Sequence, residues 1–198
     1  MPVQLVAFTA DHRISGTIPL ADDRLSDMLN SVPRIVVRGA LVEDLVDGEP
    51  AETADLTLAM GSIVAVLVTG RRGSEARRRR TAVRAARVGL TRFVVSGGLH
   101  VPSRGTEAPA RSGAGGSSDP AIVLAGRDLL VPLTDATITY DRADAPCSES
   151  AETILVNRAH VRWIDLDGAA GDGSDDALLT GRDTVYHAAA PKDFTRAI

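Results

Sequence analysis

The sequence is poor in cysteine, lysine and aromatic residues. Its single cysteine, Cys147, excludes a framework of disulfide bonds within the chain of 198 residues. One Trp, two Tyr and three Phe make up 3% of the residues, which is few for a protein that would stack single-stranded nucleic acid on exposed rings. Lys192 is the only lysine among 22 basic residues, so arginine carries almost all of the positive charge.

Long apolar stretches and a leader-like start are also absent. The first residues contain no basic cluster, and the acidic Asp11 interrupts them before an apolar stretch develops. The longest run without charge, 56–70, has 15 residues, whereas a membrane-spanning helix needs ~20 apolar residues. We therefore expect a soluble, cytoplasmic protein without a membrane span.

The chain contains an internal repeat. With 44% hydrophobic and 24% charged residues it is an ordinary globular sequence, long enough for one domain or two small ones. Two ordered pairs of segments match at offsets of 81 and 98 residues: Ile14–Leu20 with Val95–Val101, and Leu56–Val66 with Ile154–Ile164. The difference between these offsets corresponds to a segment rich in Gly, Ser and Pro at 102–120. We therefore predict a first copy over 1–70 and a second copy over 88–166 that carries a flexible insert at 102–120.

Each copy is predicted to be mainly β. Segments dense in Val, Ile, Leu and Thr, with Gly, Pro and Asp between them, are typical of antiparallel strands; they are Val3–Phe8, Arg13–Leu20, Arg34–Asp44, Thr53–Val68 and Thr153–Asp165. The last two are long enough for two strands separated by a turn. A short helix is predicted over 22–30, because Leu25, Met28 and Leu29 recur at helical spacing behind acidic residues. The tail, 167–198, is acidic, and we expect it to be partly disordered.

Two parts of the sequence resemble the Sm motifs. Thr9–Ile18, followed by Asn30 and then Ile35–Glu43, is similar to the first motif, and Leu155–Ile164 is similar to the second. The chain also resembles, more closely, an uncharacterised bacterial family of small β domains, through the segments Arg24–Asn30, Leu133–Ala136 and Val156–Val161. The resemblance implies two small antiparallel β-barrel units, Sm-like or SH3-like.

The Sm resemblance also implies a binding site for RNA, but the motif is incomplete. Asn157 and Arg158 stand where Sm proteins hold bases. In the first copy Met60 and Gly61 replace the basic turn, and in the second copy Ala159 replaces the glycine. We therefore predict Asn157 and Arg158 as candidate binding residues of an incomplete site.

The segment 71–87 between the copies is strongly basic, with eight Arg and one Glu, a charge of +7. We predict a short Arg-rich helix here, on which one arc gathers four side chains: Arg77, Arg80, Arg84 and Arg87. Such a ridge could be a solvated linker, or could bind an acidic protein, the acidic tail of the same chain, or nucleic acid. The remainder of the chain carries 14 basic and 25 acidic residues, and its net charge of −11 would repel a polyanion.

No catalytic or metal-binding pattern is recognisable. Phosphate-binding loops and nucleophile elbows are absent, and the four His residues have no metal-ligand spacing. We therefore predict no catalytic residue, no metal and no cofactor. The expected function is a non-catalytic interaction or assembly module whose partner is a protein or a second copy of the chain. The alternative is RNA or single-stranded nucleic-acid binding through the Arg-rich segment and the turn at Asn157 and Arg158.

Overall fold

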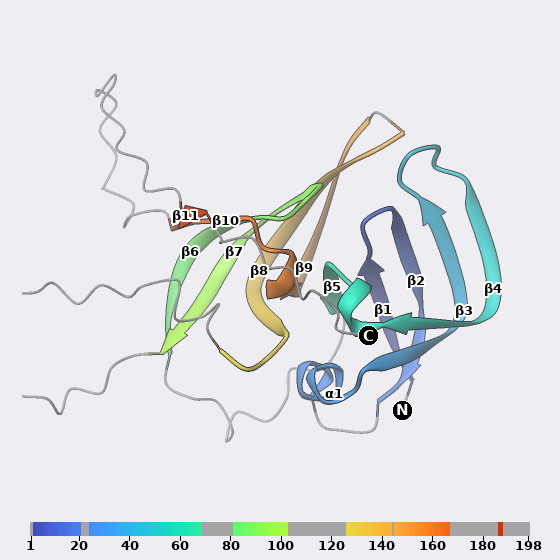
Figure 1. Ribbon diagram of the computed structural model, residues 1–198, viewed down its shortest axis with the longest axis horizontal. Helices are drawn as coiled ribbons and strands as arrows, with labels where there is room; N and C mark the ends of the chain where they lie inside the picture. Colours follow the sequence, from blue (N-terminus) through green and yellow to red (C-terminus); the bar gives the residue numbers. More distant parts are fainter. Residues whose placement is uncertain are drawn as a thin grey trace, which may run out of the picture.

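A computed structural model describes residues 2–20, 24–68, 81–102, 126–143, 145–166 and 186–187. These residues form one 11-stranded antiparallel sheet and one α-helix (Figure 1). The elements are β1 (Pro2–Phe8), β2 (His12–Pro19), α1 (Leu25–Ser31), β3 (Arg34–Asp44), β4 (Pro50–Ala59), η1 (Met60–Ser62), β5 (Ala65–Val68), β6 (Thr81–Gly89), β7 (Phe93–Pro102), β8 (Leu130–Arg142), β9 (Ala145–Asn157), η3 (Arg158–His160), β10 (Trp163–Leu166) and β11 (Tyr186–His187). The order across the sheet is β11-β10-β6-β7-β8-β9-β5-β1-β2-β3-β4.

The prediction of a mainly β fold is confirmed, but two closed barrels are not formed. The sheet is a single open layer of pairings, with β4 at one end and β11 at the other. Its two halves are joined in the middle, because β5 pairs with β9 and not only with its own neighbour β1. Figure 1 shows this pairing between the halves. Each half therefore completes the sheet of the other.

The two halves, 2–68 and 81–166, repeat the same strand order. The N-terminal half runs β5-β1-β2-β3-β4, and the C-terminal half runs β10-β6-β7-β8-β9. Individual backbone hydrogen bonds repeat as well: Val64 N to Phe8 O (2.7 Å) matches Arg162 N to Gly89 O (2.8 Å), and Met60 N to Pro33 O (3.0 Å) matches Arg158 N to Leu129 O (3.0 Å). The offsets in these matches include the 81 and 98 residues found in the sequence. The strand pairing seen in one half therefore predicts which residues of the other half are equivalent.

Both halves bend at a matching bulge. The register shifts between Ser15 and Thr17 in β2 and between Ser96 and Gly98 in β7. Opposite each shift, the neighbouring strand adopts a positive φ, +54° at Gly39 and 49° at Asp135. An extra residue in one strand bends the ladder and increases its twist, so each half curls over its own core.

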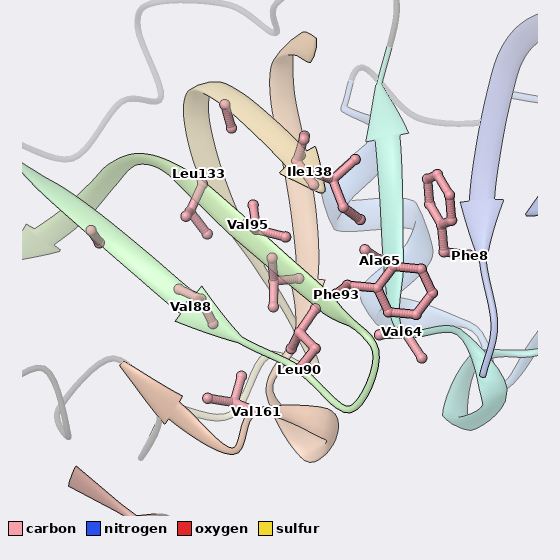
Figure 2. Close-up of a cluster of buried hydrophobic side chains, with 14 of the residues drawn as sticks. Phe8, Val64, Ala65, Val88, Leu90, Phe93, Val95, Leu133, Ile138 and Val161 are labelled. Carbon is pink, nitrogen blue, oxygen red and sulfur yellow. The ribbon is translucent and has the colours of Figure 1, made fainter. Parts of the chain in front are cut away.

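The two hydrophobic cores exchange side chains across the middle of the sheet. One core combines residues of β6 to β10 with N-terminal residues that include Phe8, Val64 and Leu67. The other core belongs to the N-terminal half but includes Leu130 and Leu155. Figure 2 shows Phe8 beside Phe93 of the C-terminal half, with ring centroids 5.4 Å apart in an edge-to-face arrangement. Separating the halves would expose both cores, so they fold as one body.

The predicted helix is present over 25–31. Its buried side chains are Leu25, Met28 and Leu29, as the helical spacing indicates. The helix is the only one among the described residues, and at 7 residues it is too short to span a membrane.

The predicted Arg-rich helix over 71–87 is wrong for its last seven residues. Residues 81–89 form β6, so the second copy begins at residue 81 and not at 88. Alanine permits both structures, and pairing with β7 along nine residues favours the strand over local helix propensity. The first part of the linker, 71–80, lies outside the described residues. So does the insert beyond Pro102, and so does the tail, 167–198, apart from β11.

Gly89 is required by the packing of Trp163. Gly89 and Trp163 are cross-strand partners in the β6–β10 pair. A Cβ atom added at residue 89 would lie 1.9 Å from the indole ring of Trp163. We expect Gly89→Ala to lower the free energy of unfolding by about 1–2 kcal/mol, because the half-buried ring must move outward. Chemical denaturation measures the effect. In a Trp163→Ala background the same change should cost nothing, and an equal loss there would contradict this explanation.

Candidate assembly interface

The junction between β5 and β9 shows how this chain joins two units by their strand edges. Four residues of each strand pair in antiparallel register: Ala65 with Val156, Val66 with Leu155, Leu67 with Ile154 and Val68 with Thr153. The N–H of Asn157 extends the ladder by donating to Val64 O at 2.9 Å. Six of the eight paired side chains are fully buried, so backbone pairing and apolar burial act together.

Asn157 fastens this junction with its side chain. It is wholly buried, with 0% of its surface exposed. Its Nδ2 donates to Ile63 O at 2.7 Å and to Met60 O at 3.3 Å, both in the N-terminal half, and its Oδ1 accepts from Ala159 N at 3.0 Å. All its amide groups therefore bond to the protein, and this candidate binding residue acts here as a clamp between the halves.

Asn30 is a second amide clamp between the halves. From the end of α1 its Nδ2 donates to Leu130 O at 3.2 Å, and its Oδ1 accepts from Leu130 N at 2.8 Å. Both bonds reach the backbone at the start of β8. The asparagine of the first Sm-like motif thus bonds to the protein's own backbone, as Asn157 does.

A half-buried ionic cluster ties the outer parts of the halves together. Arg13 donates through Nε and Nη2 to the two carboxylate oxygens of Glu149, at 2.7 and 3.1 Å, and through Nη1 to Glu43. Arg142 donates to Glu43 at 2.9 Å, and the Tyr140 hydroxyl donates to Glu149 at 2.6 Å. Burial by itself would raise the pKa of Glu149, but the bonds from Arg13 and Tyr140 outweigh it and lower that pKa. The cluster therefore holds a charged carboxylate between β2 and β9.

The edge of β4 resembles the paired edge of β9 but has no neighbour among the described residues. Eight of its ten residues are exposed. Met60 N donates to Pro33 O next to β3, and backbone groups alternate between the two sides of a strand. The N–H groups of Asp55, Thr57 and Ala59 therefore point away from β3, as those of the matching residues in β9 point to β5.

At the other end of the sheet, β11 covers the edge of β10. Trp163 pairs with His187, and Ile164 pairs with Tyr186, in antiparallel register. Transferred by the offset of 98, β10 corresponds to β5, so Tyr186 stands in the place of Leu155 on β9. Two residues of the C-terminal region thus occupy the position at which another unit's strand would pair.

Exposed charged residues lie at both ends of the sheet. The strand β4 carries the acids Glu52 and Asp55 and no base. At the other end Arg84, Arg87 and Arg162 are exposed on or next to β6 and β10, with Asp165 as the one exposed acid of β10. Exposed arginines also lie next to β4, namely Arg34 and Arg38 of β3, so neither end is of one sign when the neighbouring strand is counted.

The predicted arginine ridge is not formed by the residues that the structure describes. Arg84 and Arg87 are exposed, but three positions apart on a strand they point to opposite faces. Arg77 and Arg80 lie outside the described residues. Arg158 is half-buried in η3, and its backbone N–H bonds to Leu129. Of the arginines on the described part of the predicted ridge, Arg84 and Arg87 are therefore not brought to one face.

The histidines are dispersed, and the described residues contain no group of potential metal ligands. His12 lies 3.7 Å from Asp44, His100 lies 3.2 Å from the Thr134 hydroxyl, and His160 bonds to Gly61 O at 2.9 Å across the junction. A shallow pocket of about 450 Å³ opens beside the bulge of the C-terminal half, lined by residues of β6, β7 and β8 that include Arg87, Ser96 and Asp135.

The architecture is thus one open antiparallel sheet made of two similar halves joined edge to edge. In comparisons with family models, curated proteins and solved structures, nothing matches this chain.

Proposed function

We propose that the protein is a non-catalytic assembly module, built from two Sm-like units, that binds a protein partner by adding a strand to the edge of β4. The observation that carries this proposal is the β5–β9 junction, in which the equivalent edge accepts a strand from another unit of the same kind. The strand order is the same in both halves, which supports the interpretation of each unit as Sm-like.

The edge of β4 has the properties that strand addition requires. Its backbone N–H and C=O groups on one side lack a strand partner among the described residues, and unpaired edge groups are a template for an incoming strand. Leu58 is buried and Leu56 half-buried on one face, so an added strand would extend an existing core. Specificity would come from the acids of the same strand, which favour a partner with basic side chains.

Nucleic-acid binding, the alternative, has less support. Asn157 is buried and uses its amide within the protein. Arg84 and Arg87 lie on opposite faces of β6, so they would not follow one phosphate backbone together. Steep salt dependence of RNA binding, lost on replacing Arg84 and Arg87 by Ala, would favour the alternative.

A proline in β4 tests the proposal. Thr57→Pro removes an N–H that points away from β3, so we expect the β3–β4 pairing to persist and strand addition to fail, weakening partner binding at least about tenfold. Thr57→Val keeps the N–H and a β-branched side chain and serves as the matched control. Proteins captured by the tagged wild-type chain from its own cell extract would be purified and titrated against both variants. Equal binding to Thr57→Pro and Thr57→Val would contradict the proposal.

A further inference from the structure

We infer that the strand added to β4 is β10 of a second copy of this chain, so that molecules join head to tail, and that β11 competes for the same edge of β10. This inference rests on the proposed function and names its partner. It follows from the repeat, in which β9 corresponds to β4 and β5 corresponds to β10. Within the molecule β9 pairs with β5, and the molecule has a second strand of each kind, β4 and β10.

The repeat gives the register of the pairing between molecules. The offset of 98 residues relates β9 to β4 and β5 to β10. Each pair of the internal β5–β9 junction therefore gives the expected pair between β10 of one molecule and β4 of the next. The expected pairs are Trp163 with Leu58, Ile164 with Thr57, Asp165 with Leu56, and Leu166 with Asp55. The bond from Asn157 N to Val64 O becomes one from Ala59 N to the Arg162 carbonyl of the next molecule.

Charges of both signs lie near the proposed junction. Glu52 and Asp55 on β4 would meet a strand flanked by Arg162 and by the exposed arginines of β6. The charges that oppose it are Arg34 and Arg38 on the neighbouring strand β3, and Asp165 on β10 itself. In the expected register Asp165 lies next to Asp55, so the charges across this junction are mixed and the pairing rests on the register of the repeat.

The external junction is weaker than the internal one, which makes it reversible. Thr57 replaces Leu155, Asp165 replaces Leu67, and Ala59 replaces the clamp residue Asn157. Fewer apolar side chains would be buried and two amide hydrogen bonds would be missing. A competing strand of only two residues can therefore affect the equilibrium.

That competitor is β11. It pairs with β10 in the antiparallel direction and in the register that β9 takes on β5. By this correspondence the Tyr186 N–H points to β10, and the His187 N–H points away from it. While β11 is in place, β10 has no free edge, so the C-terminal strand limits assembly.

Installing the missing clamp tests the pairing. Ala59 is exposed, and its φ and ψ of −75° and 134° are close to the −78° and 112° of Asn157. Ala59→Asn should place an amide where it can donate to η3 of the next molecule and lower the dissociation constant for self-association about tenfold. Ala59→Asp has the same shape without the donors and should not strengthen it. Sedimentation equilibrium of the full chain measures both.

Releasing the competitor tests β11. Tyr186→Pro removes the N–H that points to β10 and should increase self-association several-fold, whereas His187→Pro leaves that N–H in place and should not. Trp163, the only tryptophan, lies on β10, so its fluorescence should change with concentration for the wild-type chain and at lower concentration for Tyr186→Pro. Adding Thr57→Pro to either strengthened variant should return it to the monomer.

The outcomes separate the two proposals. Monomers at millimolar concentration for both Ala59→Asn and Tyr186→Pro would overturn this inference, as would self-association that Thr57→Pro does not reduce. If another purified protein still bound the wild-type chain and lost affinity with Thr57→Pro, the proposed function would stand with a different partner. If no protein bound and no copy self-associated, both proposals would fail.

Discussion

Replacing Asn157 by Ala should lower the free energy of unfolding by about 3–4 kcal/mol, because each buried polar group left without a partner costs about 1–3 kcal/mol. Ile63 O loses the donor Nδ2, Met60 O keeps only its bond from Ile63 N, and Ala159 N loses its acceptor. The site has 0% exposure, so water cannot replace the bonds without entering the junction. Urea denaturation measures the loss.

Isosteric variants separate the donor from the acceptor. Asn157→Asp keeps an oxygen that can accept from Ala159 N but replaces the donors to the N-terminal half by a buried charge facing two carbonyls. It should therefore destabilise at least as much as Asn157→Ala. If Asn157→Ala cost less than about 1 kcal/mol, the amide would not be the clamp that the geometry indicates.

The local elements of this fold could be predicted from the sequence. The strand segments either alternate apolar with polar residues or contain consecutive β-branched residues. The turns at Met60–Ser62 and Arg158–His160 interrupt two long apolar stretches at the predicted places. The repeat could also be read directly, because both halves keep the Ser-Gly pair at the bulge. These features depend on short-range patterns, which one sequence contains.

The arrangement of the halves could not be predicted in the same way. A signal was present: Ile154, Leu155 and Val156 are consecutive apolar residues, whereas the first copy has Thr57 between two leucines. A strand that is apolar on both faces is buried on both faces, and this difference marks β9 as internal and β4 as an edge. The roles of Asn30 and Asn157 were missed because an exposed ligand-binding amide and a buried clamp have the same sequence signature. The helix expected near residue 81 was wrong because a partner strand overrode alanine propensity.

Replacing Arg13 should be nearly as costly as replacing Asn157. Its guanidinium contacts Glu43 and Glu149, and the side chains of the three residues are only 20%, 13% and 25% exposed. Removing one partner of a buried ion pair costs about 3–5 kcal/mol, and partial exposure reduces the expected loss for Arg13→Met to about 2–3 kcal/mol. Glu149→Gln should cost less, because the neutral amide still accepts a hydrogen bond and leaves no unpaired anion.

The acid side of the stability profile tests the same cluster, because the pKa of Glu149 is lower in the folded protein than in the unfolded chain. Such a carboxylate contributes stability that is present above its unfolded pKa, about 4.3, and that is lost as the pH falls through the folded pKa. Wild type should therefore exceed Glu149→Gln in unfolding free energy at pH 7, and the difference should shrink below about pH 4. In the Arg13→Met background the difference at pH 7 should shrink, since the bidentate donor is gone and only the Tyr140 hydroxyl and the charge of Arg142 still favour the carboxylate. A pH-independent gap between wild type and Glu149→Gln would show that the carboxylate acts through packing and not through its charge, and would contradict an ionic link between β2 and β9.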